Sequence, residues 1–252
     1  MANAPAFNKP YRDLALIYDE LIGNAAFECW KEVFGRLSRR YGMQFEVAAD
    51  IACGTGLAAQ YIASLCSRVY AVDRSAWMLD VARERDTHNN IVFLEQPFTR
   101  LALPEPVDIL TCNFDSLNYL TQESDLKETL RRFASNIKPG GHAVFDMNTT
   151  RELACEWGDS VLVHRLNRGF SIWEMNWDER SRTNTLRMTN FIKVDGDKYR
   201  MSEELHQERS YDLELVVKLI GRAGFKAVEA YDAKGLDAVS EDTRRVQFVA
   251  RV

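Results

Sequence analysis

Paired cysteines and long apolar runs are both missing from this sequence of 252 residues. Its five cysteines are scattered, odd in number and never spaced as C-x-x-C, which argues against a disulfide framework and a structural zinc site. No apolar run approaches the roughly 20 residues that span a bilayer, and the first residues lack the basic-then-apolar pattern of an export signal. We therefore expect a cytoplasmic protein with no membrane partner.

An excess of basic charge is also missing. The chain has 32 Lys and Arg against 37 Asp and Glu, a formal net charge of −5. Such a chain lacks the broad positive field of a nucleic-acid-binding protein, so we expect no nucleic-acid partner. The four histidines have no ligand-like spacing, and we expect no metal.

Apolar periodicity divides the chain into three parts. Spacings of three and four residues predict helices over 11–41. Short apolar strands then alternate with helices five times up to Asn148, which predicts a parallel sheet with helices on both faces. Beyond that point, period-two segments separated by turn signals predict antiparallel hairpins, followed by a helix and two strands. The expected hairpin strands are 160–167, 170–178, 183–194 and 198–210, and the closing elements are 212–223, 225–231 and 244–252.

A glycine turn at residues 53–56 joins the first expected strand to the following helix, where backbone N–H groups can approach a ligand. Residues 54–59 satisfy the loose G-x-G-x-x-G/A pattern of dinucleotide binding, and Asp73 stands where a ribose-binding acid belongs. However, Asp50 precedes Gly54 by four residues. A carboxylate at that position would repel a pyrophosphate and attract an ammonium group, which favours a different cofactor.

Four runs extend this observation along the chain: D-I-A-C-G-T-G (50–56), A-V-D-R-S-A-W-M-L-D-V-A-R (71–83), V-D-I-L-T-C-N-F-D-S-L-N-Y-L (107–120) and K-P-G-G (138–141). Together they resemble the class I S-adenosylmethionine-dependent methyltransferases over nearly the whole chain. Tyr18-Asp19 and the run E-L-H-Q-E-R-S-Y (204–211) resemble a small-molecule branch that includes sugar-amine N-methyltransferases. The resemblance implies an α/β fold with a Rossmann-like seven-stranded sheet, mostly parallel with the last strand antiparallel. It also implies an antiparallel β-hairpin insertion after the fifth strand.

The same resemblance implies how S-adenosylmethionine would be held. Asp50 would face the methionine amine, and Asp73 would accept hydrogen bonds from both ribose hydroxyls, a task that suits a carboxylate because it only accepts. Members of the family often have an acidic residue just after the third strand that contacts the adenine. In this sequence that position falls near Pro97, which has no such side chain, so Gln96 or the backbone of Phe98 would make the contact. The other implied contacts are Ala52, Gly54 and Gly56 beneath the methionyl and ribose groups, Arg74 and Met78 beside the adenine, and Asn113 and Phe114 near the methionine.

Candidates for the acceptor site follow the carboxyl ends of the strands, where open α/β sheets bind ligands. Asp115 either binds a substrate cation, acts as a base or caps a loop. Tyr18 either covers the cofactor or packs in the helical core, and His206 either moves a proton near pH 7 or is structural. Trp173 either stacks on the substrate or packs in the hairpin core. The catalytic candidates are His206, Asp115 and Tyr18, and the substrate-binding candidates are Tyr11, Asn118, Tyr119, Trp173 and Arg209.

These patterns predict one methyltransferase domain over 1–252, with a helical cap at 1–41 and a β insertion at 158–210 that forms part of the substrate pocket. The expected reaction is in-line transfer of a methyl group from S-adenosylmethionine to a nitrogen or oxygen of a small molecule. Three alternatives stay open: a protein or RNA acceptor, an NAD-dependent oxidoreductase, and a non-catalytic cofactor-binding module. A homodimer that pairs through the hairpin sheet is also left open.

Overall fold

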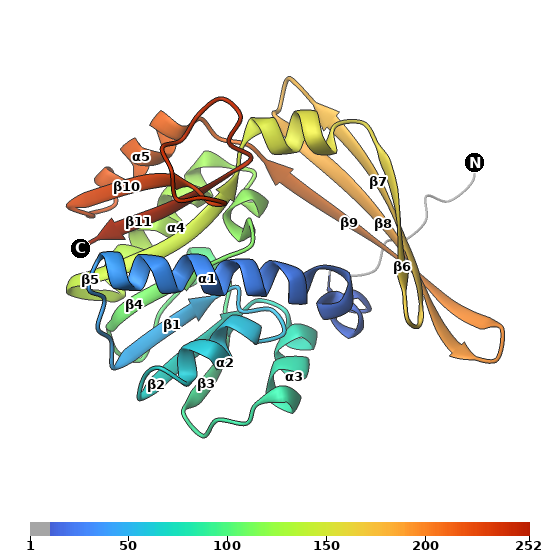
Figure 1. Ribbon diagram of the computed structural model, residues 1–252, viewed down its shortest axis with the longest axis horizontal. Helices are drawn as coiled ribbons and strands as arrows, with labels where there is room; N and C mark the ends of the chain where they lie inside the picture. The colour runs from blue at the N-terminus through green and yellow to red at the C-terminus, as the bar shows by residue number, and fades with distance from the viewer. Residues whose placement is uncertain (1–10) are drawn as a thin grey trace.

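Two β-sheets make up the framework of the computed structural model, which describes residues 11–252. A seven-stranded sheet carries helices on both faces, and a four-stranded antiparallel sheet stands beyond the carboxyl ends of its parallel strands (Figure 1). Residues 1–10, which belong to the expected helical cap, lie outside the described residues. In the part of the chain that the structure describes, no helix is both long and apolar enough to cross a membrane.

The seven-stranded sheet confirms the expected fold class. Its spatial order is β10-β11-β5-β4-β1-β2-β3, and β11 is the strand that runs antiparallel to both of its neighbours. The last strand is therefore the antiparallel one, as predicted. The strands are β1 (Val47–Ile51), β2 (Arg68–Asp73), β3 (Ile91–Glu95), β4 (Val107–Cys112), β5 (Ile137–Asn148), β10 (Ala227–Asp232) and β11 (Arg245–Arg251).

Helices cover this sheet on both faces because its strands alternate between two apolar cores. In β1, Ala48 packs into one core and Ala49 into the other. The first core takes α1 (Asn24–Arg40), α2 (Leu57–Ala63) and part of α3 (Ala76–Arg85). The opposite core takes α4 (Glu123–Ser135) and α5 (Leu213–Arg222).

The order of the strands creates a crevice at one edge. β1 lies between β2 and β4, so the connections that leave β1 and β4 diverge at the carboxyl ends of the strands. Open α/β sheets bind ligands at such a switch point. The turn at residues 52–56 and the loop that follows β4 both lie there.

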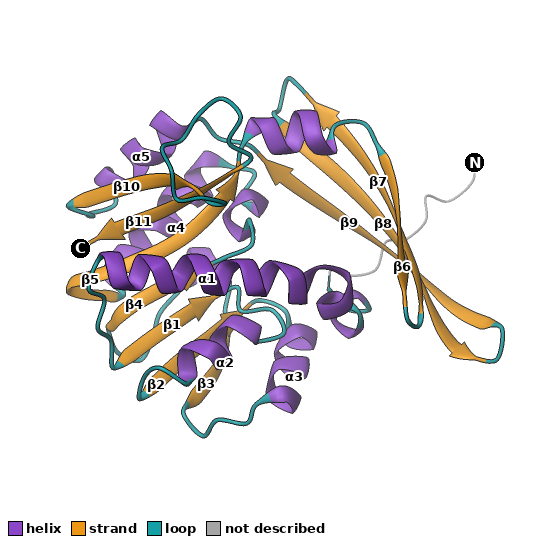
Figure 2. Cartoon of the chain, in the orientation of Figure 1, coloured by secondary structure: helices purple, strands orange, loops and turns teal. Residues whose placement is uncertain are grey.

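The second sheet follows β5 and has the order β6-β7-β8-β9 (Figure 2). Its strands are β6 (Val161–Leu166), β7 (Gly169–Asp178), β8 (Thr183–Asp195) and β9 (Lys198–Arg209). Strand side chains alternate between the two faces of a sheet. In β9, every second residue is buried, namely Ser202, Glu204, His206 and Glu208. These four side chains therefore share the face that looks inward.

The N-terminal segment links the two sheets, but it is not the regular helix that its spacing predicted. A 3-10 turn at Leu14–Leu16 and a π-helical turn at Asp19–Gly23 precede α1. Leu14 and Ile17 pack against Met188 and neighbouring apolar residues of β7 and β8. This contact with the second sheet bends the segment across the carboxyl ends of the main sheet (Figure 1).

Gly56 offers a test of the turn that precedes α2. It has a φ of +82°, and an added Cβ would lie 3.0 Å from the Cβ of Ala82. Left-handed backbone and close packing both oppose a side chain, so Gly56→Ala should lower the free energy of unfolding by about 1–3 kcal/mol in urea titrations. Gly196→Ala is the matched control, because Gly196 has a φ of +48° with no atom within 4 Å of an added Cβ. Equal losses in the two variants would contradict the packing argument.

Candidate functional site

A cavity lies between the carboxyl ends of the main sheet, the N-terminal segment and the inward face of the second sheet. It holds about 1080 Å³ of space that no atom fills, part of it open to solvent. Twelve residues predicted from the sequence line it: Tyr11, Tyr18, Ala52, Gly54, Asp73, Arg74, Met78, Phe114, Asp115, Tyr119, Trp173 and His206.

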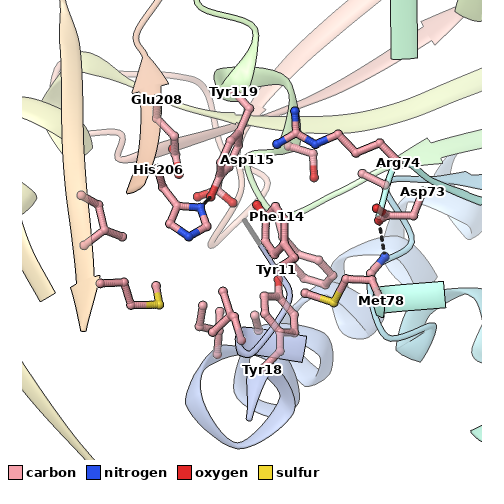
Figure 3. Close-up of a pocket in the computed structure, with 18 of the residues that line it drawn as sticks. Tyr11, Tyr18, Asp73, Arg74, Met78, Phe114, Asp115, Tyr119, His206 and Glu208 are labelled. Atoms are coloured by element: carbon pink, nitrogen blue, oxygen red, sulfur yellow. Dashed lines mark hydrogen bonds between the residues drawn. The ribbon is translucent and has the colours of Figure 1, made fainter. Parts of the chain in front are cut away.

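Asp73 organises one end of the cavity. It ends β2, and its carboxylate accepts hydrogen bonds from the backbone N–H of Gly54 at 2.9 Å and of Ser75 at 2.8 Å. Gly54 has a φ of +53° with no atom within 4 Å of an added Cβ, so the backbone of the turn is open there. Burial raises the pKa of Asp73 above its usual value. Arg74 and Met78 lie beside it on the wall of the cavity (Figure 3).

Asp50 and Asn113 lie behind this end of the cavity and do not line it. Thr111 donates a hydrogen bond to one carboxylate oxygen of Asp50 at 2.7 Å, and the other oxygen is buried without a partner. Both amide atoms of the Asn113 side chain are likewise buried without a partner. Burial raises the pKa of Asp50 to about 7. Buried polar atoms are normally paired, so these unpaired atoms near the ends of β1 and β4 make Asp50 and Asn113 candidates for binding a polar group.

The other end of the cavity holds a network of charged residues. Arg245 lies 3.3 Å from Asp115 and 3.4 Å from Asp146, measured between guanidinium nitrogens and carboxylate oxygens. Asn148 donates to Asp115 at 2.7 Å and to Glu208 at 3.2 Å. Burial and the nearby Asp115 raise the pKa of Glu208 well above its usual value. Burial alone would lower the pKa of Arg245, but Asp115, Asp146 and Glu208 raise it above its ordinary value.

His206 lies next to this network and meets two tyrosines. Its Nδ1 is 3.2 Å from the hydroxyl of Tyr119, and its ring makes an edge contact with Tyr11. Its Nε2 is buried without a hydrogen-bond partner, although a carboxylate oxygen of Glu204 lies 3.4 Å away. Glu204 also accepts from the backbone N–H groups of Tyr11 at 2.6 Å and Leu14 at 3.1 Å. This carboxylate therefore fastens the N-terminal segment to β9.

The remaining wall of the cavity is apolar. Trp157 and Trp173 line it together with Leu186, Met188 and Leu14. The indole N–H of Trp173 is already satisfied, since it donates to Ser171 at 2.9 Å. The exposed ring surface is what this wall offers to a ligand. A bound molecule would thus meet charged groups at one side and aromatic or aliphatic groups at the other.

Some predicted residues lie away from the cavity. Gln96 pairs through both amide atoms with the backbone of Ala102, at 3.0 and 3.2 Å. Asn118 is buried and donates to the backbone oxygens of Asn148 and Arg209. The Arg209 side chain donates to the backbone of Thr121 and stacks over Tyr211. Gly56 begins α2 and is outside the lining as well.

The position of Arg209 has a simple cause. It is three residues beyond His206 on a strand, and an odd spacing places two side chains on opposite faces. The same alternation points from His206 to Glu204 and Glu208, which the sequence reasoning missed. Arg245 was missed too. It lies 37 residues beyond Glu208, at the start of β11, and nothing in the sequence around it marks it as a site residue.

Comparison with known proteins gives a consistent result. Residues 48–141 match the family described as methyltransferase domain. The chain is similar to a candidate methyltransferase of Geobacillus sp. (strain WCH70), with 28% identity over 96% of this chain and 99% of that protein. It is also similar to the dTDP-3-amino-3,6-dideoxy-alpha-D-glucopyranose N,N-dimethyltransferase of Streptomyces fradiae, with 28% identity over 58% of this chain and 59% of that protein. Among solved structures, an S-adenosylmethionine-dependent methyltransferase from Clostridium acetobutylicum ATCC 824 superposes with a TM-score of 0.85 at 24% identity, covering 97% of this chain and 99% of that one.

The pKa of Asp50 predicts a pH-dependent effect on stability. An aspartate titrates near ~3.9 when unfolded and, because of burial, at about 7 here. The folded state keeps a proton that the unfolded state releases, so stability present at low pH is lost as pH rises through 7. Asp50→Asn removes the buried charge and should raise Tm by roughly 3–8 °C at pH 8, with a much smaller gain at pH 5. Scanning calorimetry measures both, with the exposed Asp197→Asn as control. An identical gain at both pH values would show that Asp50 does not titrate in this range.

Glu204 predicts a second effect, on the N-terminal segment. Its carboxylate accepts two backbone hydrogen bonds there, whereas a glutamine offers one acceptor oxygen and an unwanted donor. Glu204→Gln should therefore let the segment open more often and raise the rate of tryptic cleavage after Arg12 by roughly tenfold, the equivalent of about 1.4 kcal/mol. Glu203→Gln, on the opposite face of β9, is the control and should leave the rate unchanged. Equal cleavage rates for the two variants would mean that the carboxylate does not fasten the segment.

Proposed function

We propose that this chain is a class I S-adenosylmethionine-dependent methyltransferase, which transfers a methyl group from S-adenosylmethionine to a nitrogen or oxygen of a small molecule. The methyltransferase-domain match over residues 48–141, and the similar proteins that are named methyltransferases, support the family, the enzymatic activity and the cofactor. One observation carries the residue-level proposal. Two buried carboxylates, Asp50 and Asp73, flank the open glycine turn, and one of them has a free oxygen.

The residues present fit this cofactor. We assign the methionine amine to Asp50 and Asn113, whose buried polar atoms lack partners. We assign the ribose hydroxyls to Asp73 at the wall of the cavity, and the adenine to the neighbourhood of Arg74 and Met78. The remaining contacts proposed are Ala52, Gly54 and Phe114 along the turn and the loop after β4. When bound, S-adenosylmethionine supplies a methyl group already activated by a sulfonium.

The protein then has to align the acceptor, exclude water and manage a proton. Tyr11 and Tyr18 come from the N-terminal segment and cover the cavity, which removes water from it. His206 is the proposed proton acceptor, because its buried Nε2 is unpartnered and Glu204 lies close enough to stabilise an imidazolium. Asp115 and Tyr119 complete the proposed acceptor side.

The nature of the acceptor is also part of the proposal. The second sheet and the N-terminal segment enclose the cavity, which suits a small molecule better than a protein or RNA chain. The name of the similar protein from Streptomyces fradiae, which refers to an amino-sugar substrate, supports this. We also propose a cytoplasmic location, supported by cysteines that are all free among the described residues. The net charge of −5 supports the absence of a nucleic-acid partner, and a homodimer through the second sheet stays a hypothesis.

Isothermal titration with S-adenosylhomocysteine tests the cofactor site. Asp73→Asn replaces the carboxylate that would accept hydrogen bonds from the ribose hydroxyls with a neutral amide. Hydrogen bonds to charged groups contribute about 1.5–3 kcal/mol, so the affinity for S-adenosylhomocysteine should fall roughly 10- to 100-fold. Asp80→Asn, on the exposed side of α3, is the control and should bind like the unmodified protein. A titration with NAD runs in parallel. Tighter binding of NAD than of S-adenosylhomocysteine, or no loss in Asp73→Asn, would refute the proposal.

A further inference from the structure

The charged end of the cavity carries an inference about the acceptor, which rests on the proposed function. We propose that the acceptor is a compact amine with an apolar body, bound as its ammonium between Asp115 and Glu208. The proposal excludes acceptors that are linked to a nucleotide. It is carried by the balance of charge at one side of the cavity and by the chemistry of the opposite wall.

Acidic groups outnumber basic ones at this end. Three carboxylates, Asp115, Asp146 and Glu208, face the single guanidinium of Arg245 within this network of described residues. Asp146 is already engaged, because its two oxygens accept from the backbone N–H groups of Phe114 and Asp115 at 3.0 and 2.6 Å. Asp115 and Glu208 remain as the carboxylates that line the cavity. Burial and the nearby Asp115 raise the pKa of Glu208. A cation bound between these two carboxylates would stabilise the charged form of Glu208, so the pair favours a cationic ligand.

The position of this excess charge matches the place where an acceptor atom is needed. Figure 3 shows Asp115, Glu208 and His206 gathered on one side of the cavity, with Asp73, Arg74 and Met78 on the other. An ammonium held by the two carboxylates would therefore lie on the same side of the cavity as the imidazole of His206.

The rest of the acceptor would contact the apolar wall. Trp157, Trp173, Leu186 and Met188 offer ring faces and methyl groups there. Burial of apolar surface at such a wall contributes roughly 25 cal/mol per Å². An acceptor whose remaining part is aryl or alkyl would gain this free energy on binding, whereas an acceptor whose remaining part is strongly hydrated would not.

Among residues 11–252, no arginine or lysine on the acceptor side is free to bind a nucleotide diphosphate. Arginine, lysine and backbone N–H groups are what bind phosphates in proteins. The arginines that line the cavity are Arg74, on the cofactor side, and Arg245. Arg245 is already held by Asp115 and Asp146, and the same carboxylates would repel a phosphate.

The reaction balances with groups on hand. The bound ammonium gives one proton to the imidazole of His206 and becomes a neutral amine with a free electron pair. That pair forms the new N–C bond while the S–C bond breaks, which leaves a methylated ammonium and S-adenosylhomocysteine. His206 later returns its proton to solvent. Glu204, 3.4 Å from Nε2, stabilises the transient imidazolium.

Binding measurements on the full chain saturated with S-adenosylhomocysteine test the inference. The probes are phenethylamine, the matched neutral 2-phenylethanol, and thymidine diphosphate. Phenethylamine should bind at least roughly tenfold more tightly than 2-phenylethanol, about 1.4 kcal/mol, and thymidine diphosphate should not bind at this site. Glu208→Gln should remove most of the preference for the amine. Asp115→Asn should do the same and serves if Glu208→Gln fails to fold, while Glu203→Gln, on the outer face of the same strand, should keep it.

Turnover with methyl-labelled S-adenosylmethionine adds a second readout, in which the label should reach the nitrogen of phenethylamine and not 2-phenylethanol. Equal affinity for phenethylamine and 2-phenylethanol would overturn the inference, and so would competition of thymidine diphosphate with phenethylamine for the site. It would also be overturned if the preference for the amine survived both variants, or if phenethylamine bound without being labelled. Each of these results leaves the proposed function intact if S-adenosylhomocysteine binds. Failure of S-adenosylhomocysteine to bind removes the proposed function itself.

Discussion

The buried carboxylate of Asp73 is the contact on which the site depends. Its two oxygens accept from the backbone of Gly54, in the turn after β1, and of Ser75, at the start of α3. One side chain thus holds two loops at the switch point of the sheet in a fixed relation. Free backbone N–H groups at helix starts need such acceptors, and the buried carboxylate supplies them while one side stays open to the cavity.

A second carboxylate closes the cavity from the opposite direction. Glu204 fastens the N-terminal segment to β9, and Thr55 donates to Asp19 at the other end of that segment, at 2.5 Å. The segment is therefore attached both to the glycine turn at residues 53–56 and to the second sheet. This arrangement would couple the proposed cofactor and acceptor sides, because the same stretch of chain contacts both.

The cavity is chemically divided. Carboxylates and His206 occupy one side, aromatic and aliphatic groups the other, and the cofactor turn a third. In the proposed reaction the methyl group is already activated, so alignment and the protonation state of the acceptor are what this chain would have to control. The division would provide both, because the charged side would place the proposed nucleophile and the apolar wall would orient its body.

The sequence by itself determined the fold class and the cofactor turn. Asp50, Gly54 and Asp73 are read from strand ends and a glycine turn, which are local features, and the four hairpin strands were placed almost at their observed bounds from period-two spacing alone. The tertiary structure decided the acceptor side and the N-terminal segment. Glu204 accepts a hydrogen bond from the backbone of Leu14, 190 residues away, in the segment where a 3-10 turn replaces the helix that local spacing predicted. Arg245 contacts Asp115, which is 130 residues earlier in the chain. Strand alternation places Arg209 and His206 on opposite faces of β9, but it does not indicate which of the two faces borders the cavity. Local periodicity specifies which side chains share a face, whereas the packing of distant strands decides what that face meets.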